Sequence, residues 1–186
     1  MRTIRTLAAL AAIALTLGAA QACKGRKPAG TPNVVTGDAV LGITIDELLA
    51  TQTFQNAKYD GTVAVIWPEK VDDIIKDEAL LTPVDCVAAM TGEGQVVKVI
   101  EVMSIGAPEE LARGVLADCS TIKDAFCERY GEGKDVVLPK ALMNAIEPGK
   151  ELALMRWLKD DMSVWLLFAR DAEGKYYWKI LYKLEK

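Results

Sequence analysis

The side chains best suited to chemistry in this 186-residue chain are four cysteines, Cys23, Cys86, Cys119 and Cys127, in a sequence that contains no histidine. Without an imidazole, the chain cannot carry a Ser-His-Asp or Cys-His catalytic arrangement, a histidine-ligated metal or a histidine-based pH switch. Cys119 and Cys127 are separated by seven residues, a spacing that matches no metal motif. We therefore expect no metal and no cofactor.

Cys23 follows a segment with the three parts of a secretory signal. Arg2 and Arg5 give a basic start, residues 7–17 form an apolar run, and Ala20-Gln21-Ala22 is a small-residue exit. As a helix the apolar run is about 17 Å long, against a bilayer hydrocarbon core of about 30 Å, so it is too short to span a membrane. The sequence predicts a signal peptide over residues 1–22.

The segment from Ala20 to Cys23 resembles the lipobox of bacterial lipoproteins, in which the cysteine after the cleavage site receives diacylglycerol. The resemblance implies that the mature chain begins at acylated Cys23 and contacts the membrane through that lipid. Lys24 takes the place of the aspartate that holds many such proteins at the inner membrane, which implies the outer membrane, facing the periplasm. Ordinary signal peptidase is also able to cleave before Cys23, and a chain without the lipid is soluble in the periplasm or secreted.

Residues 23–41 predict a flexible tether, because they are rich in Gly, Pro and Thr and show no hydrophobic periodicity. Residues 42–186 are long enough for one domain with a real core. From Leu41 onward the chain has 17 basic and 25 acidic residues, a net charge of −8. An acidic domain repels phosphate groups, so we expect no nucleic acid among its partners.

Acylation of Cys23 leaves three cysteines, an odd number for an oxidising compartment. In a continuous helix, Cys119 and Cys127 lie about 12 Å apart along the axis, too far for a disulfide with each other. Either of them is a candidate partner for Cys86. We expect a Cys86–Cys119 disulfide, with Cys127 as the thiol outside it. A helix break at Ser120-Thr121 would relax this constraint, and an unacylated Cys23 would allow two disulfides.

Aromatic side chains near the C-terminus are candidates for lining a pocket that takes an apolar ligand or a sugar, although large aromatics on a sheet also build cores. The five candidates are Trp157, Trp165, Tyr176, Trp178 and Tyr182. The acidic pair Asp72-Asp73 is no catalytic dyad, because adjacent helical positions point about 100° apart. No other spacing pairs a nucleophile with a base.

Hydrophobic periodicity places these residues on an α+β framework. Thr44 begins a capping-box helix, further helices are predicted over 68–81, 107–130 and 140–146, and residues 62–67 form a short strand. A hairpin turn at 91–94 joins strands over 84–90 and 95–105. Strands over 151–158, 162–170 and 175–184 form a closing three-stranded meander. Together they predict a mainly antiparallel sheet of about six strands packed against two or three helices.

The closing hairpin resembles the end of NTF2-like domains, where a Gly-Lys turn is followed by a Trp-Lys-Ile strand. The corresponding residues are Gly174, Lys175, Trp178, Lys179 and Ile180. The resemblance covers about 35 residues, and no site residue of that family is carried over.

These features indicate a cell-envelope lipoprotein with a non-catalytic binding or accessory role. Its partner is expected to be another envelope protein or a small apolar ligand. A small envelope enzyme that uses carboxylates or a thiol is the alternative from another class, and a structural spacer is the third.

Overall fold

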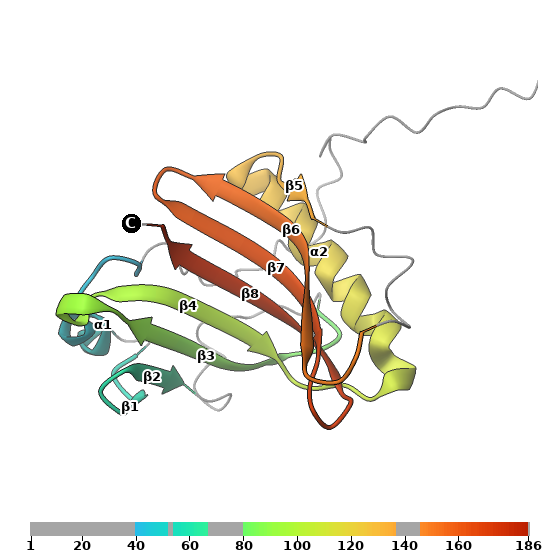
Figure 1. Cartoon of the computed structure of the whole chain (residues 1–186), viewed down its shortest axis with the longest axis horizontal. Coiled ribbons are helices and arrows are strands. Elements are labelled where there is room, and N and C mark those ends of the chain that lie inside the picture. Colours follow the sequence, from blue (N-terminus) through green and yellow to red (C-terminus); the bar gives the residue numbers. More distant parts are fainter. Residues whose placement is uncertain (1–39, 52–53, 67–79, 137–145, 186) are drawn as a thin grey trace, which may run out of the picture.

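The computed structural model describes residues 40–51, 54–66, 80–136 and 146–185, and its main feature is one curved antiparallel sheet (Figure 1). Its eight strands are β1 (Lys58–Tyr59), β2 (Val63–Ile66), β3 (Val84–Thr91), β4 (Val97–Ser104), β5 (Lys134–Asp135), β6 (Lys150–Lys159), β7 (Met162–Arg170) and β8 (Tyr176–Leu184). They lie in the order β1-β2-β3-β4-β8-β7-β6-β5. The α+β class agrees with the prediction, but the strand number exceeds the expected six. The two-residue edge strands β1 and β5 are too short to produce an alternating pattern.

The long helix α2 (Ala112–Tyr130) follows a 3-10 turn at Glu109–Leu111 and packs against β6, β7 and β8 (Figure 1). A second 3-10 turn, Glu93–Gln95, lies in the β3–β4 hairpin. No helix in the described ranges is long and apolar enough to cross a bilayer. The helices expected over 68–81 and 140–146 lie outside the described residues, apart from positions 80, 81 and 146.

The short helix α1 (Ile45–Ala50) has the predicted capping box. The Thr44 hydroxyl accepts a hydrogen bond from the Glu47 backbone N–H, and the Glu47 carboxylate accepts one from the Thr44 N–H at 2.8 Å. Ile45 and Leu48 are buried beneath this helix. Val40 and Leu41, just before the helix, also pack against the core.

Pairing of β4 with β8 joins the early β3–β4 hairpin to the closing meander. Ile100 lies opposite Tyr182, and Val102 lies opposite Ile180, which makes β4 and β8 the centre of the sheet. The hairpin and the three-stranded meander agree with the prediction, and β4 and β7 both lie inside the sheet. Because β4 and β8 are distant in sequence, this pairing is the long-range contact that makes one sheet of the two parts.

The two faces of the sheet differ in chemistry. The face under α2 is an apolar core in which the Phe126 ring contacts the rings of Trp157 and Tyr182, with centroid distances of 5.3 and 6.2 Å. On the opposite face the ammonium of Lys179 lies 3.3 Å from Glu101 and 2.5 Å from Glu151. Side chains on adjacent positions of a strand point to opposite faces, so Trp178 and Lys179 belong to different environments.

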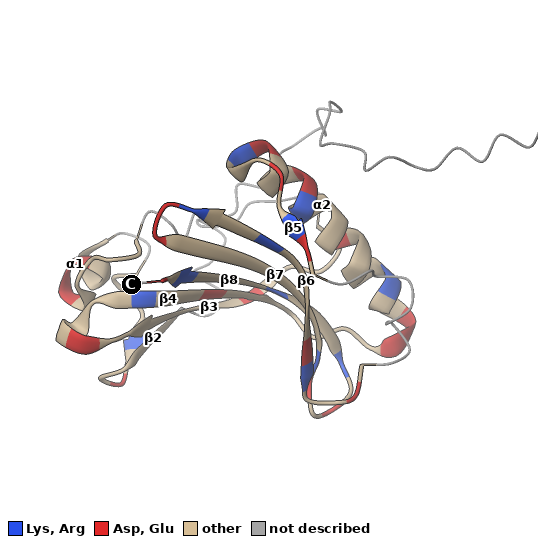
Figure 2. Cartoon of the chain, turned by 45° about the horizontal axis from the view of Figure 1, so that its top comes forward, with Lys and Arg blue, Asp and Glu red and all other residues tan. Residues whose placement is uncertain are grey.

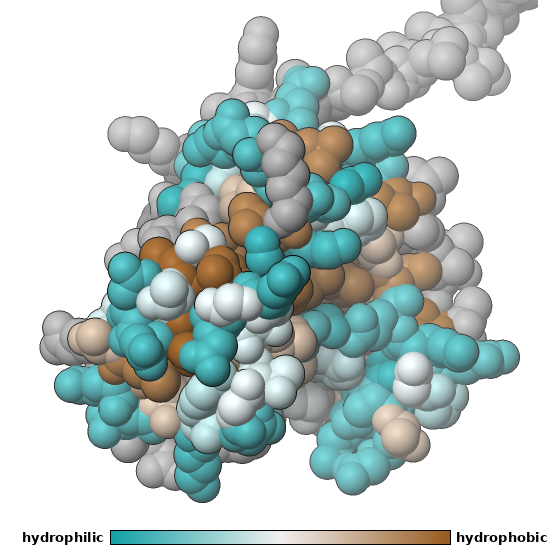
Figure 3. Space-filling view, turned by 60° about the vertical axis from the view of Figure 1, so that its left-hand side comes forward, coloured by the Kyte–Doolittle hydropathy of each residue, from teal (hydrophilic) through white to brown (hydrophobic). Residues whose placement is uncertain are grey.

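Charged residues of both signs are interspersed over the described elements (Figure 2). Viewed from the side of α1, hydrophilic side chains cover most of this end of the molecule, with smaller apolar areas between them (Figure 3).

Candidate ligand groove

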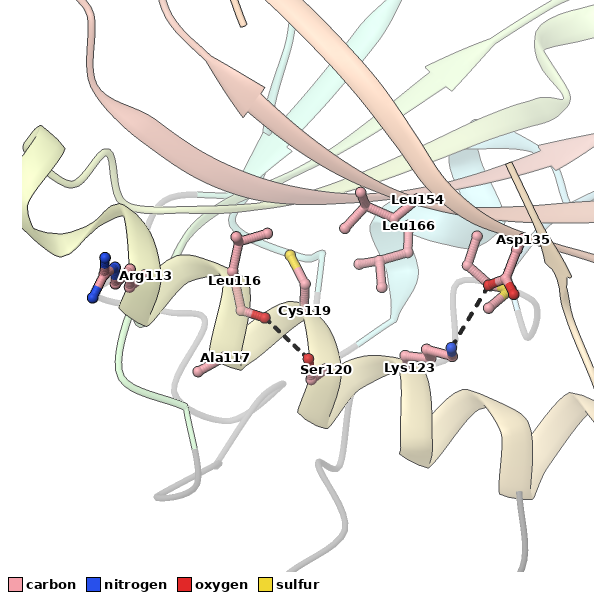
Figure 4. A pocket seen from close by; sticks show the side chains of 10 residues that line it. Arg113, Leu116, Ala117, Cys119, Ser120, Lys123, Asp135, Leu154 and Leu166 are labelled. Carbon is pink, nitrogen blue, oxygen red and sulfur yellow. Dashed lines mark hydrogen bonds and ion pairs between the residues drawn. The ribbon is translucent and has the colours of Figure 1, made fainter. Parts of the chain in front are cut away.

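A groove of about 430 Å³ opens between one flank of α2 and strands β5, β6 and β7 (Figure 4). Its volume lies within the range of small-molecule sites, roughly 300–1,000 Å³. The described residues that line it are Arg113, Leu116, Ala117, Cys119, Ser120, Lys123, Asp135, Leu154, Met155 and Leu166. The groove is therefore formed jointly by the helix, the edge of the sheet and two meander strands.

Helical spacing explains why one side of α2 forms the wall. The lining positions of α2 follow one another at intervals of three, one, three and three residues, which places them along one flank of the helix. They are Arg113, Leu116, Ala117, Ser120 and Lys123. The neighbouring stripe, which includes Val115, Cys119, Ile122 and Phe126, is buried against the sheet. Leu111 precedes Val115 by four residues, but it lies in the 3-10 turn before the helix and is 56% exposed.

The floor of the groove is apolar, and its side chains are largely buried. Leu154, Met155, Leu166 and Cys119 are 8%, 3%, 1% and 3% exposed. Burial, and next the Asp118 carboxylate, raise the pKa of the Cys119 thiol well above its usual value. At neutral pH this thiol is therefore protonated and a poor nucleophile, and the floor offers an apolar surface only.

The polar groups of the groove lie at its rim. The Lys123 ammonium is 3.6 Å from the Asp135 carboxylate, and the two side chains are 42% and 68% exposed. The Ser120 hydroxyl donates to the Leu116 carbonyl at 3.3 Å, which satisfies its donor within the helix. Arg113 is exposed at the other end of the lining (Figure 4). This arrangement is able to hold an apolar group below charged rim residues.

The cysteines do not form the expected Cys86–Cys119 disulfide. Within the described part of the chain, Cys86, Cys119 and Cys127 are all reduced and buried. Cys86 pairs with Met103 and shares its face of the sheet with Glu101, whereas Cys119 belongs to the core on the opposite face, under α2. The sheet itself separates the two sulfur atoms, so they cannot meet. Cys127, expected outside the disulfide, is 6% exposed and part of the core. Cys23 lies outside the described residues.

The five candidate pocket aromatics do not border the groove. Trp157, Tyr176, Trp178 and Tyr182 are at most 2% exposed and form part of the core. Trp165 lies on the opposite face, where the Arg156 guanidinium sits 4.5 Å from its ring centroid. Their role here is packing, and the groove lies instead along aliphatic side chains of β6, β7 and α2.

Asp118 is a buried carboxylate that the sequence pattern did not single out. It is 1% exposed, and its two oxygens accept hydrogen bonds from the backbone N–H groups of Leu81 and Thr82, each at 2.8 Å. The Thr82 hydroxyl also donates to Asp118, and it accepts a hydrogen bond from the Trp178 indole N–H at 2.9 Å. Together these contacts fasten residues 81–82 to the flank of α2 opposite the groove. Every polar atom has a partner, so the role is structural.

The ionic cluster around Lys179 is also satisfied internally. Lys179 is 7% exposed between Glu101 and Glu151, and the Tyr177 hydroxyl donates to Glu151 at 3.3 Å. Burial, followed by the Glu151 carboxylate, raises the pKa of Tyr177 to about 12. In the closing β7–β8 hairpin, Gly174 has a positive φ of 88° in the turn, and Trp178 and Ile180 are buried.

No family model, no curated protein and no solved structure matches this chain.

Proposed function

We propose that this chain is a cell-envelope lipoprotein that binds a small, largely apolar ligand in the groove without changing it chemically. Acylated Cys23 anchors it to the outer membrane, and the domain faces the periplasm. The observation that supports the binding role is the groove of about 430 Å³ with an aliphatic floor. An open apolar surface of this kind gains free energy when a ligand removes it from water.

Two observations favour binding over catalysis. The Cys119 thiol at the groove has a raised pKa, whereas a catalytic thiol needs a lowered one. Among the described lining residues, the one carboxylate, that of Asp135, is exposed and paired with Lys123. The same groove favours binding over a spacer role, because a spacer needs no concave apolar surface.

Titration with the neutral fluorescent probe N-phenylnaphthylamine tests the binding role. The purified protein is expected to enhance probe fluorescence with saturation at one site. Ala117→Trp places a large side chain in the groove wall and is expected to abolish this enhancement. Ala172→Trp is the matched control, because Ala172 is an exposed residue of the β7–β8 turn and does not line the groove. Circular dichroism checks that both variants fold.

Saturable binding that Ala117→Trp removes and Ala172→Trp preserves supports the proposal. Absence of saturable binding, or equal binding by all three proteins, contradicts it.

A further inference from the structure

The interior of the groove offers a ligand almost no hydrogen-bonding partner. Leu154, Met155 and Leu166 supply aliphatic or thioether surface, and the buried Cys119 adds a protonated thiol. In the part of the lining that the structure describes, the one hydroxyl, that of Ser120, already donates to the Leu116 carbonyl. Burying a polar group without a partner costs free energy, so the part of a ligand that lies on this floor must be apolar. Any polar part of the same ligand must lie at the rim.

Lys123 and Arg113, the cationic residues at the rim, differ in whether they are free to bind an anionic group of a ligand. Lys123 is held by Asp135, whose carboxylate repels an incoming anion at that end. Among the described residues, no hydrogen bond or ion pair engages the Arg113 side chain. A guanidinium presents two parallel N–H groups that match the two oxygens of a carboxylate. Arg113 is therefore the rim position suited to an anionic head.

The distance along the helix sets the shape of the ligand. Arg113 and Lys123 are ten residues apart in α2, which corresponds to about 15 Å along the helix axis. The apolar floor lies between these two ends (Figure 4). An elongated chain fits this geometry better than a compact ring system, because its length follows the helix while its head stays at one end.

We propose that the groove takes a single-chain alkyl carboxylate, with the chain on the Cys119–Leu154–Leu166 floor and the carboxylate at Arg113. This inference rests on the proposed binding role and adds the ligand class and its orientation. The overall charge of the domain does not account for such a preference, because the domain is acidic and repels anions. Selectivity for the anion has to come from the local contact at Arg113.

Displacement of N-phenylnaphthylamine by dodecanoate and by dodecanol tests this inference, because the two competitors share a chain length and differ in head charge. Both are used at low salt and below the concentrations at which they aggregate. Dodecanoate is expected to bind about three- to tenfold more tightly than dodecanol, the range for a charge-assisted contact at an exposed arginine. Arg113→Gln is expected to bring the affinity for dodecanoate down to that for dodecanol. Lys58→Gln, on edge strand β1 at the opposite side of the sheet, is the matched control that also removes one positive charge.

Each outcome separates the two proposals. Preference for dodecanoate that Arg113→Gln removes and Lys58→Gln retains supports the inference. Equal affinity for the two competitors overturns the carboxylate assignment and leaves the binding role intact. Equal weakening by both variants overturns the assignment to Arg113, because it shows a general charge effect. Failure of the probe and both competitors to bind overturns the binding role itself.

Discussion

Replacement of Asp118 by alanine should destabilise the domain strongly although this side chain does not line the groove. The carboxylate accepts three hydrogen bonds, from the Leu81 N–H, the Thr82 N–H and the Thr82 hydroxyl. Through Thr82 it is connected to the Trp178 indole in the core. Alanine removes the acceptor of all three and leaves a small void beside α2.

The loss of stability depends on which of the three hydrogen-bond donors can bind water once the carboxylate is removed. Hydrogen bonds to a charged acceptor contribute about 1.5–3 kcal/mol each, and a buried donor left without a partner costs about 1–3 kcal/mol. The Leu81 N–H is only partly buried and is able to bind water, whereas the Thr82 N–H is buried. We therefore expect a loss of about 3–5 kcal/mol for Asp118→Ala, which corresponds to roughly 9–15 °C in Tm for a domain of this size. Asp118→Asn should lose about half as much, because its amide oxygen still accepts while its NH₂ group faces a donor.

Urea unfolding followed by tryptophan fluorescence measures these changes. Asp124→Ala is the matched control, because Asp124 is an exposed aspartate on the same helix and should change the free energy of unfolding by less than about 0.5 kcal/mol. A loss below about 1 kcal/mol for Asp118→Ala, or equal losses for the two alanine variants, would refute the reasoning that this network holds residues 81–82 to α2.

Three further predictions concern other parts of the molecule. Burial, and then the charges of Asp85 and Glu101, raise the pKa of Cys86 to about 11. Iodoacetamide at pH 8 should therefore alkylate Cys86 about two orders of magnitude more slowly in the folded protein than in urea. Peptide mass mapping measures the two rates, and similar rates in both states would contradict this prediction. Since the folded state holds this proton more tightly, the contribution of Cys86 to stability is fully present below about pH 8.5 and is lost as the pH rises through about 11. Lys179→Met leaves Glu101 and Glu151 without their shared cation and should lower the free energy of unfolding in urea by about 1–3 kcal/mol. This range includes a reduction for solvent screening, because Glu151 is partly exposed. Unchanged stability would mean that the cluster contributes nothing. When expressed in a Gram-negative host, the protein should partition into the detergent phase, and its intact mass should be that of a chain acylated at Cys23. The Cys23→Ser variant should remain in the aqueous phase. An unacylated mass for the parent protein would overturn the proposed lipid anchor.

Local patterns predicted the elements whose signals lie within a few residues. The capping box at Thr44, the hairpin turn after Thr91 and the three-stranded meander each depend on neighbouring residues or on simple alternation. The alternation Tyr176, Trp178, Ile180, Tyr182 also gave the buried face of β8 correctly. These β8 side chains lie in a core rather than a pocket because α2 packs over them, and no local sequence pattern predicts that packing.

Long-range partners explain what the sequence did not reveal. Asp118 binds residues that precede it by 36 and 37 positions, and its role depends on where that loop lies. The Cys86–Cys119 disulfide was expected because helical spacing keeps Cys119 and Cys127 apart and leaves Cys86 as the candidate partner for either. On β3 both faces carry apolar residues, so alternation does not show which face holds Cys86. The register with Met103 settles this question and separates the two thiols.

The groove follows from a mismatch between the width of the sheet and the width of one helix. Eight strands at about 4.8 Å spacing make a sheet more than 30 Å wide, whereas a helix with its side chains is about 10–12 Å across. α2 therefore covers only part of the β6–β8 region, and side chains on its flank must fill the remaining space. Ala117 and Ser120 are too small to do so, and β5 contributes only two residues at that edge. Among the described residues, small side chains at these two positions leave apolar surface of β6 and β7 that α2 does not cover, and uncovered apolar surface lowers stability. The ligand proposed above would cover that surface.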